Sequence, residues 1–417
     1  MDEPGWFVGF DWASECHYVC LLDADGKCIA EREVKHDGAA LSELCSWLTE
    51  KSGASPARIA VAIEVPRGPV VEVLLERGFQ VFAINPKQLD RFRDRFTMAG
   101  AKDDRRDALV LGGSLRTDQS AFRRVSVDDP LVIELREWSR MHDELTQERT
   151  RLANRLRGQL WRYYPQAGEL TDDVAADWFL DLWEQVPTPE QAARASDKII
   201  AQILKKHRIR RLDASAALRI LRKPSLVVAS GTVPAATAHI RIIAARVKLL
   251  NQQIKEVGQR LDQLCAAIEA AAENNPGQIC EQRDLEILRS CPGLGRINIA
   301  TLLAEASEPL RKRDYHVLRV LTGSAPVTRR SGKSCIVLRR HACNKRLAQT
   351  MYHWARVAMQ HDPRSRQRYA ELRRRGHSHG RSLRTIADRL LYVLCTLLQH
   401  QTLFDSGFAT SQEAAAT

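Results

Sequence analysis

The sequence lacks any apolar run long enough to cross a membrane. A membrane-spanning helix needs about 18 to 20 consecutive apolar residues, and the best candidate, residues 390–403, is interrupted by three polar residues at 399–401. The N-terminus lacks the basic start of a signal peptide, because Asp2 and Glu3 stand there. These absences predict a cytoplasmic protein with no membrane partner.

Closely spaced cysteine pairs are also missing. The chain has 10 cysteines, which are scattered along it with no C-x-x-C. Cys335, His341 and Cys343 come nearest to a zinc half-site, but a second ligand pair at usable spacing is absent. In a cytoplasmic chain this usage predicts reduced thiols.

Charge is plentiful and unevenly distributed along the 417 residues. Residues 1–128 contain 17 Lys and Arg against 21 Asp and Glu, whereas residues 283–417 contain 24 against 10. Basic surfaces neutralise phosphates and release counterions. The C-terminal third is therefore predicted to contact nucleic acid, and the acidic start of the chain requires another explanation.

Residues 1–125 alternate between strand and helix patterns, which predicts a mixed α/β sheet covered by helices. The turn chemistry of residues 23–26 joins two of the strands as a hairpin. The expected strands are 6–11, 18–22, 28–34, 58–65 and 79–84, and the expected helices are 39–51, 70–77, 87–98 and 104–116.

Strand signals stop after residue 125, which predicts an all-α remainder. Two long amphipathic patterns, residues 131–164 and 235–272, indicate an antiparallel helical arm or coiled-coil-like pair. Residues 171–233 are helical with proline breaks and suggest no role, and residues 285–403 are again helical. The predicted domains are 1–125 (α/β), 126–282 (helical arm with an insertion) and 283–405 (C-terminal helical domain), followed by a disordered tail, 406–417.

Four carboxylates stand where strands end or a helix begins. Asp11 ends the first apolar strand and Glu64 ends the strand before Val65, while Asp104 and Asp107 open a helix three residues apart, on one helical face. Each acid alone is also explained as a turn, cap or helix-dipole residue. Together they predict a cluster that requires divalent cations, most naturally Mg²⁺, and two such ions clamp a phosphodiester.

The segments around these acids resemble a known family. F-D-W-A at the start, A-I-E-V-P, A-I-N-P at residues 83–86 and A-K-D-D-R-R-D-A are similar to the ribonuclease H-like, Holliday-junction-resolvase-like domain of the insertion sequence 110 family of transposases. By position, Asp11, Glu64, Asp104 and Asp107 match the acidic (DEDD) tetrad of that family. Asp103 stands where the family more often has a threonine.

Two features of the C-terminal third point to nucleic acid. Residues 285–306 predict a helix-hairpin-helix around Gly293 and Gly295, whose tight turn allows backbone amides to meet a phosphate; an ordinary helical turn is the alternative. Basic side chains surround the Ser331–Gly332 step that follows, and we expect them to contact nucleic acid: Arg329, Arg330, Lys333, Arg339, Arg340, Lys345 and Arg346.

Ser331 is a candidate nucleophile. Positive charge stabilises both an alkoxide and the developing phosphorane, although Ser-Gly is also a common loop dipeptide. The pattern P-G-L-G, A-T-L-L-A-E, L-T-G-S-A-P and S-G resembles the second domain of the same transposase family, in which Ser331 matches the catalytic serine. Past Ser331 the family's frequent Ser-Lys-x-Gly stretch is replaced by residues 340–344.

The resemblance implies a DNA recombinase that cuts and rejoins insertion-element ends and target DNA. It implies a covalent phosphoserine link, a structured non-coding (bridge) RNA that pairs with donor and target DNA, and a dimer or tetramer in which different protomers supply the acidic and serine domains. The basic surface alone permits an RNA without indicating one, because backbone contacts do not distinguish RNA from DNA.

Three other functions remain open from the sequence. A metal-dependent junction-resolving nuclease would leave Ser331 inert and form no covalent adduct. A non-catalytic nucleic-acid-binding protein would use the acids only structurally. Residues 8–11 also resemble the phosphate loop of a sugar kinase, but the missing Gly-Thr after Asp11 and the basic helical C-terminus argue against it.

Overall fold

The computed structural model describes residues 3–84, 86–96, 103–125, 129–273, 279–332 and 334–405. The chain divides into two compact units, residues 1–128 and 129–417. The expected tail, 406–417, and Lys333 lie outside the described residues. Within the described part, no helix combines the length and apolar character needed to cross a membrane.

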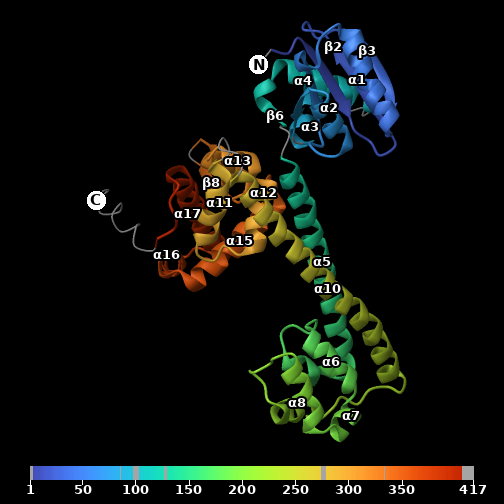
Figure 1. The fold of residues 1–417 in the computed structure, drawn as a ribbon, viewed down its shortest axis with the longest axis vertical. Coiled ribbons are helices and arrows are strands. Elements are labelled where there is room, and N and C mark those ends of the chain that lie inside the picture. Colours follow the sequence, from blue (N-terminus) through green and yellow to red (C-terminus); the bar gives the residue numbers. More distant parts are fainter. Residues whose placement is uncertain are drawn as a thin grey trace, which may run out of the picture. The chain divides into compact units, whose positions relative to one another are not determined.

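The first unit, drawn in blue to teal in Figure 1, contains a sheet with helices packed on it. The sheet is mixed and six-stranded, in the order β3-β2-β1-β4-β5-β6. β1 pairs antiparallel with β2 and parallel with β4, β5 extends the parallel part, and β6 returns antiparallel. The mixed sheet and its four helices confirm the α/β expectation. The strands are β1 (Trp6–Asp11), β2 (Cys16–Leu22), β3 (Cys28–Lys35), β4 (Ile59–Ile63), β5 (Gln80–Ala83) and β6 (Arg123–Arg124), and the helices are α1 (Gly38–Ser52), α2 (Pro69–Glu76), α3 (Pro86–Phe96) and α4 (Asp104–Thr117).

Side-chain alternation divides this sheet between two hydrophobic cores. Val8 and Phe10 of β1 pack with residues of α1 and α2. Phe7, one residue out of phase, packs on the opposite face with Leu111 and Leu115 of α4. Odd-numbered positions of β1 therefore face α4.

The second unit is built on two long helices, α5 (Pro130–Tyr163) and α10 (Thr232–Glu273), which pack against each other. They run antiparallel, because Glu134 near the start of α5 binds Arg260 late in α10 and Glu148 binds Arg246. Asp129 caps α5 by accepting a hydrogen bond from the Leu131 amide, 2.8 Å away, and Pro130 begins the first turn.

Each end of this helix pair contributes to its own hydrophobic core. One core contains the later part of α5, the earlier part of α10 and the intervening segment that the sequence left without a role. The other contains Leu135, the later part of α10 and the C-terminal helices. The intervening helices are α6 (Asp177–Gln185), α7 (Pro189–Arg194), α8 (Asp197–Lys206) and α9 (Ala214–Leu221), and the C-terminal ones are α11 (Ile279–Ser290), α12 (Arg296–Glu305), α13 (Ser307–Arg311), α14 (Tyr315–Leu321), α15 (Lys345–His361), α16 (Pro363–Arg374) and α17 (His379–His400).

The expectation that residues 285–403 are entirely helical is wrong. A two-stranded hairpin, β7 (Val327–Ser331) and β8 (Ser334–Leu338), interrupts the helices. Gly332 takes a positive φ of 53° in its turn, a conformation that glycine adopts without steric cost. Ser331 pairs with Ser334 and therefore lies at the tip of this hairpin.

Candidate active site

Asp11 and Glu64 lie at the same edge of the first sheet. β1 and β4 are parallel neighbours in which Phe10 pairs with Ile63, so the next residue of each strand, Asp11 or Glu64, occupies the carboxyl end. Asp11 is in phase with Phe7, and Glu64 follows Ala60 and Ala62, which share the core of α4. Alternation therefore directs both carboxylates toward the α4 side of the sheet.

Helix α4 crosses β1 at unusually close range. A Cβ on Gly9 would lie 1.7 Å from the Ala108 carbonyl oxygen, and one on Gly112 would lie 2.9 Å from the Gly9 nitrogen and 3.4 Å from the Val8 carbonyl carbon. Arg105 at the start of α4 donates to Glu31 of β3, level with Gly9 across the sheet, whereas Arg116 at its end donates to the Ala24 carbonyl, beyond the other end of β1, so α4 runs antiparallel to β1. Its N-terminal turn, which holds Asp104 and Asp107, therefore approaches the strand end that carries Asp11.

Asp107 is buried, with 2% of its surface exposed, and it is held by an arginine from α3. Arg93 donates from Nε to Oδ1 at 2.6 Å and from the terminal nitrogen Nη2 to Oδ2 at 2.7 Å. Burial opposes the charge of Arg93, but its bonds to Asp107 and the charges of Asp107, Asp90 and Glu64 raise its pKa. The influence of Glu64 indicates that it lies near the same guanidinium.

Asp103 has a different task from its neighbour Asp104. Its carboxylate accepts the Arg106 amide at 2.8 Å and caps α4, which is a role that threonine also performs. The Asp104 side chain belongs to the first turn and is exposed. Asp103 is therefore used for capping, and Asp104 stays available as a ligand.

The residue chemistry at this edge suits a hard divalent cation, since carboxylate oxygens are its preferred ligands. In the described residues, however, the one group of three or more candidate ligand atoms within 4.8 Å of one another is Cys20, Cys28 and Glu31. The four acids thus share an edge without forming a closed ligand set, and Arg93 occupies the ligand oxygens of Asp107. A cation near Asp107 would therefore share these carboxylate oxygens with the positive charge of Arg93.

Nothing in the sequence singles out Arg93. It lies in a helix that also carries Arg91 and Arg95, and nothing in the spacing distinguishes the three. Only the packing of α3 beside α4 identifies the arginine that reaches Asp107.

In the second unit, Ser331 is exposed at the tip of the β7–β8 hairpin. Arg329 and Arg330 precede it on β7, and both are exposed. Arg339 is exposed and Arg340 half-buried just after β8, while Lys345 is exposed at the start of α15. The hairpin therefore presents the serine in a cationic setting.

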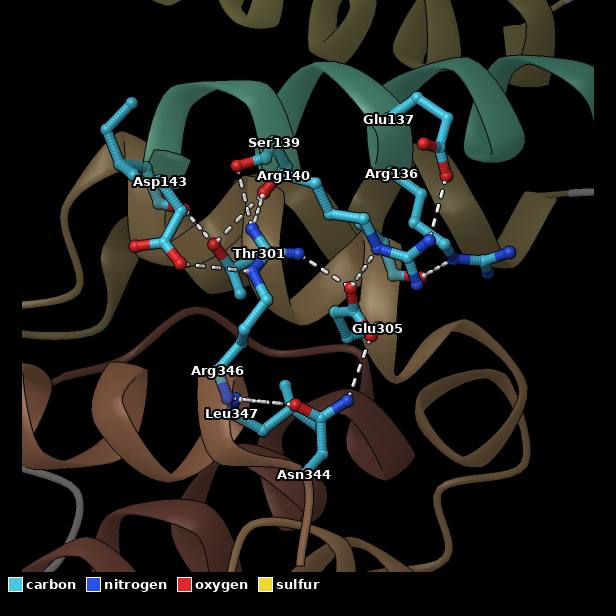
Figure 2. Close-up of polar contacts among 12 residues, drawn as sticks. Arg136, Glu137, Ser139, Arg140, Asp143, Thr301, Glu305, Asn344, Arg346 and Leu347 are labelled. Atoms are coloured by element: carbon cyan, nitrogen blue, oxygen red, sulfur yellow. Dashed lines mark hydrogen bonds and ion pairs between the residues drawn. The ribbon is translucent and has the colours of Figure 1, made fainter. Parts of the chain in front are cut away.

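Arg346 has a different environment from these exposed cations (Figure 2). Its guanidinium donates to Glu305 at 2.6 Å and to the carbonyl and hydroxyl oxygens of Ser139 at 2.7 and 2.8 Å. Arg140 and Asn344 also bind Glu305, at 3.0 and 2.9 Å. The Arg346 side chain thus connects α5, α12 and α15 through hydrogen bonds within the protein.

The turn between α11 and α12 packs on α15. Gly293 has a φ of 78°, and a Cβ there would lie 2.6 Å from the Ala358 nitrogen. Trp354 donates to the Pro292 carbonyl at 3.0 Å. Gly293 is therefore required for close packing, whereas Gly295 is exposed at the N-cap of α12 and is the one better placed for a phosphate.

Comparison with family models gives two matches. Residues 8–165, which contain the acidic edge, match a model described as a transposase. Residues 285–370, which contain the serine hairpin, match one described as the transposase IS116/IS110/IS902 family.

Several curated proteins are similar to this chain. A mini-circle putative transposase for IS117 of Streptomyces coelicolor is 32% identical over 98% of both chains. An insertion element IS116 protein of Streptomyces clavuligerus is 27% identical over 98% of both. A putative transposase of Sinorhizobium fredii, y4uE, is 58% identical over 53% of this chain and 62% of its own length.

Proposed function

This chain belongs to the IS110 family of transposases and acts in DNA recombination at insertion elements, and we propose that it cuts and rejoins element ends and target DNA through a metal-bound acidic site and a serine nucleophile. One observation carries the proposal: strand alternation and the Gly9 contact direct Asp11, Glu64, Asp104 and Asp107 toward one sheet edge. In this reading the first unit is a ribonuclease H-like domain.

In the proposed reaction, the Ser331 hydroxyl oxygen forms a bond to phosphorus while the bond from phosphorus to a deoxyribose oxygen breaks. The serine proton is lost to a base and the leaving oxygen gains one, so atoms balance without an external co-reactant. Arg329 and Arg330 flank the serine on an exposed strand. Their charge favours both the attacking oxygen and the added negative charge on phosphorus.

The acids are proposed to hold Mg²⁺, with Asp11, Glu64, Asp104 and Asp107 as ligands. Bound there, the ion supplies charge neutralisation for a phosphodiester. The chain's own contribution is to fix the ligands, since Asp11 and Glu64 end rigid strands and Asp104 and Asp107 begin a helix pressed onto one of them.

Three further features belong to the same proposal. Residues 126–282 form the helical arm and residues 283–405 the serine domain. A bridge RNA guides the reaction, and the protein works as a dimer or tetramer held by the arm. Of the predicted nucleic-acid contacts, Arg329, Arg330, Arg339, Arg340 and Lys345 are supported by partial or full exposure. Arg346 and Gly293 also make packing contacts within the protein, and their contact with nucleic acid stays a prediction.

Trapping a covalent adduct tests the function. The purified protein is incubated with Mg²⁺, DNA of its element ends and RNA transcribed from the element's flank, and then denatured. We expect a protein–DNA adduct that survives denaturation and is lost in both Ser331→Ala and Asp11→Ala. Ser334→Ala, beside the same turn, is the matched control and should keep the adduct.

The alternatives give different results in the same experiment. A plain nuclease would cleave without an adduct, be unaffected by Ser331→Ala and be inactivated by Asp11→Ala. A non-catalytic binding protein would leave the DNA intact in every variant. Either result would overturn the serine mechanism.

Metal affinity tests the competition at Asp107. Removing the guanidinium in Arg93→Gln frees both carboxylate oxygens, so we expect Mn²⁺ to bind about tenfold more tightly, which corresponds to about 1.4 kcal/mol. Asp107→Asn should weaken binding instead. Free Mn²⁺ measured by electron paramagnetic resonance reports both.

Arg91→Gln makes the same charge change at an exposed position of α3. It should leave Mn²⁺ affinity within twofold of the wild type. Equal gains in the Arg91 and Arg93 variants would show a general charge effect and remove Asp107 from the ligand set.

A further inference from the structure

A pocket in the second unit lies at the base of the β7–β8 hairpin, away from the tip that carries Ser331. It is formed by the loop after α14, the segment after β8, one face of α15 and the first turns of α17. Its polar lining consists of Thr322, Ser324, Arg339, Arg340, Tyr352 and Arg384.

The pocket gathers positive charge without a matching acid. Arg384 is half-buried, and neither it nor Arg339 makes an ion pair within the part of the chain that the structure describes. The acid one turn further along α17, Asp388, is held by Arg319 through two bonds of 3.0 and 2.6 Å. Burial and the charges of Arg339 and Arg381 lower the pKa of Arg384. An anion bound here would stabilise the charged guanidinium against both effects.

Neutral groups around the arginines are also suited to an anion. The buried Thr322 hydroxyl lies 3.1 Å from the buried Ser324 hydroxyl and 3.5 Å from the Arg319 carbonyl oxygen. When Thr322 donates to the nearer Ser324 oxygen, the Ser324 proton is left for another acceptor. Gly380 lines the pocket from the first turn of α17, where the positive end of the helix dipole favours negative charge.

The distance between the pocket and Ser331 is compatible with the spacing of phosphates along a DNA strand. Each hairpin strand has five residues, so Ser331 lies about 13 Å from the hairpin base, at about 3.3 Å per residue. Phosphates advance about 3.4 Å per nucleotide along one strand of a duplex and further in an extended strand. The pocket therefore suits a backbone phosphate that lies a few nucleotides from the phosphate at Ser331, on the same DNA strand.

We propose that this pocket binds a backbone phosphate of the cut DNA strand, about two to four nucleotides from the phosphate that Ser331 attacks. Arg384 and Arg339 supply the charge and Ser324 a hydrogen bond. Tyr352, 42% exposed at the rim, offers an aromatic face to the adjoining nucleotide. The inference rests on the proposed serine chemistry for the identity of the strand, but the anion site itself follows from the pocket.

The salt dependence of binding tests the phosphate contact without requiring cleavage. For a labelled element-end duplex, we expect Arg384→Gln and Arg339→Gln each to weaken binding about five- to tenfold and to reduce the slope of log K against log salt by about one. Arg384→Lys should keep the slope. Arg155→Gln, at an exposed position of α5, controls for net charge and should change neither value.

Single neutral phosphates locate the contact. Methylphosphonates are placed one at a time on either side of the cut. We expect one position, about two to four nucleotides from the cut, to weaken the wild type but not Arg384→Gln, because that variant has already lost the contact.

Three results would overturn the proposal: unchanged slopes in both arginine variants, additive losses at every methylphosphonate position, or a loss seen only with an RNA of the same sequence. Arg339 is exposed, so its variant stays informative even if Arg384→Gln folds poorly. A wild type that forms no adduct would contradict the serine mechanism, while the salt slopes would still decide whether the pocket binds phosphate.

Discussion

Replacing Gly9 with alanine is expected to destabilise the first unit by about 3 kcal/mol or more and to abolish the acidic site with it. The new methyl group would lie 1.7 Å from the Ala108 carbonyl oxygen and 2.7 Å from the Gly112 nitrogen. Both are backbone atoms of α4, so no side-chain rotation relieves the clash. The helix must move off the sheet and carry Asp104 and Asp107 away from Asp11.

Urea denaturation combined with hydrogen exchange of β1 and α4 measures this effect. Gly112→Ala should cost less, because its nearest contacts are at 2.9 and 3.1 Å, the second of them a flexible Leu22 methyl group. Gly38→Ala meets nothing within 4 Å and should change stability by no more than about 0.5 kcal/mol. Equal behaviour of all three variants would contradict the close approach.

Much of the first unit could be predicted because β1, β2, β4 and β5 are short, strongly apolar and bounded by clear turns or helices. The ends of the strands could also be predicted, and the parallel pairing of β1 with β4 brings Asp11 and Glu64 to one edge of the sheet. The contact of Gly9 with α4 could not be predicted from the sequence, since a glycine in a strand has many explanations. Arg93 was missed for the same reason: long-range packing selects one arginine among several.

The serine hairpin shows where local reasoning failed. The segment of residues 327–338 is short, lies between strong helical patterns and is largely exposed. It therefore has no apolar alternation that would indicate strands. The turn at Gly332 and the β-branched residues Ile336 and Val337 of β8 were the available signals. Sequence distance alone groups the basic residues near Ser331. It does not distinguish the half-buried Arg346 from the exposed cations, and it does not bring in Arg384, which lies far along the chain on α17.

The second large effect is expected at Glu305, whose side chain is 8% exposed and accepts bonds from Arg140, Arg346 and Asn344. Glu305→Ala removes the carboxylate and leaves two guanidinium groups partly buried beside each other. Breaking a buried ion pair from one side costs about 3–5 kcal/mol. Glu305→Gln keeps the shape and should cost less, about 1–2 kcal/mol.

Exposed and buried ion pairs on the same segment provide the control. Glu308 binds Lys312, whose side chain is 64% exposed, so Glu308→Ala should cost no more than about 1 kcal/mol. Urea denaturation followed by tryptophan fluorescence, with hydrogen exchange of α12 and α15, measures the difference. A similar cost for Glu305→Ala and Glu308→Ala would mean that the network in Figure 2 contributes little to stability.

The pH dependence gives an independent check on the same carboxylate. Burial opposes its ionisation, but the charges of Arg140 and Arg346 and its hydrogen bonds lower the pKa of Glu305 below the ordinary 4.5. Its contribution to stability is therefore complete above pH 4.5 and is lost as the pH falls through the lowered pKa. The stability difference between wild type and Glu305→Gln should shrink below pH 4.5. Because Asn344 both binds Glu305 and caps α15, we expect the same acid range to loosen the segment that anchors the serine hairpin.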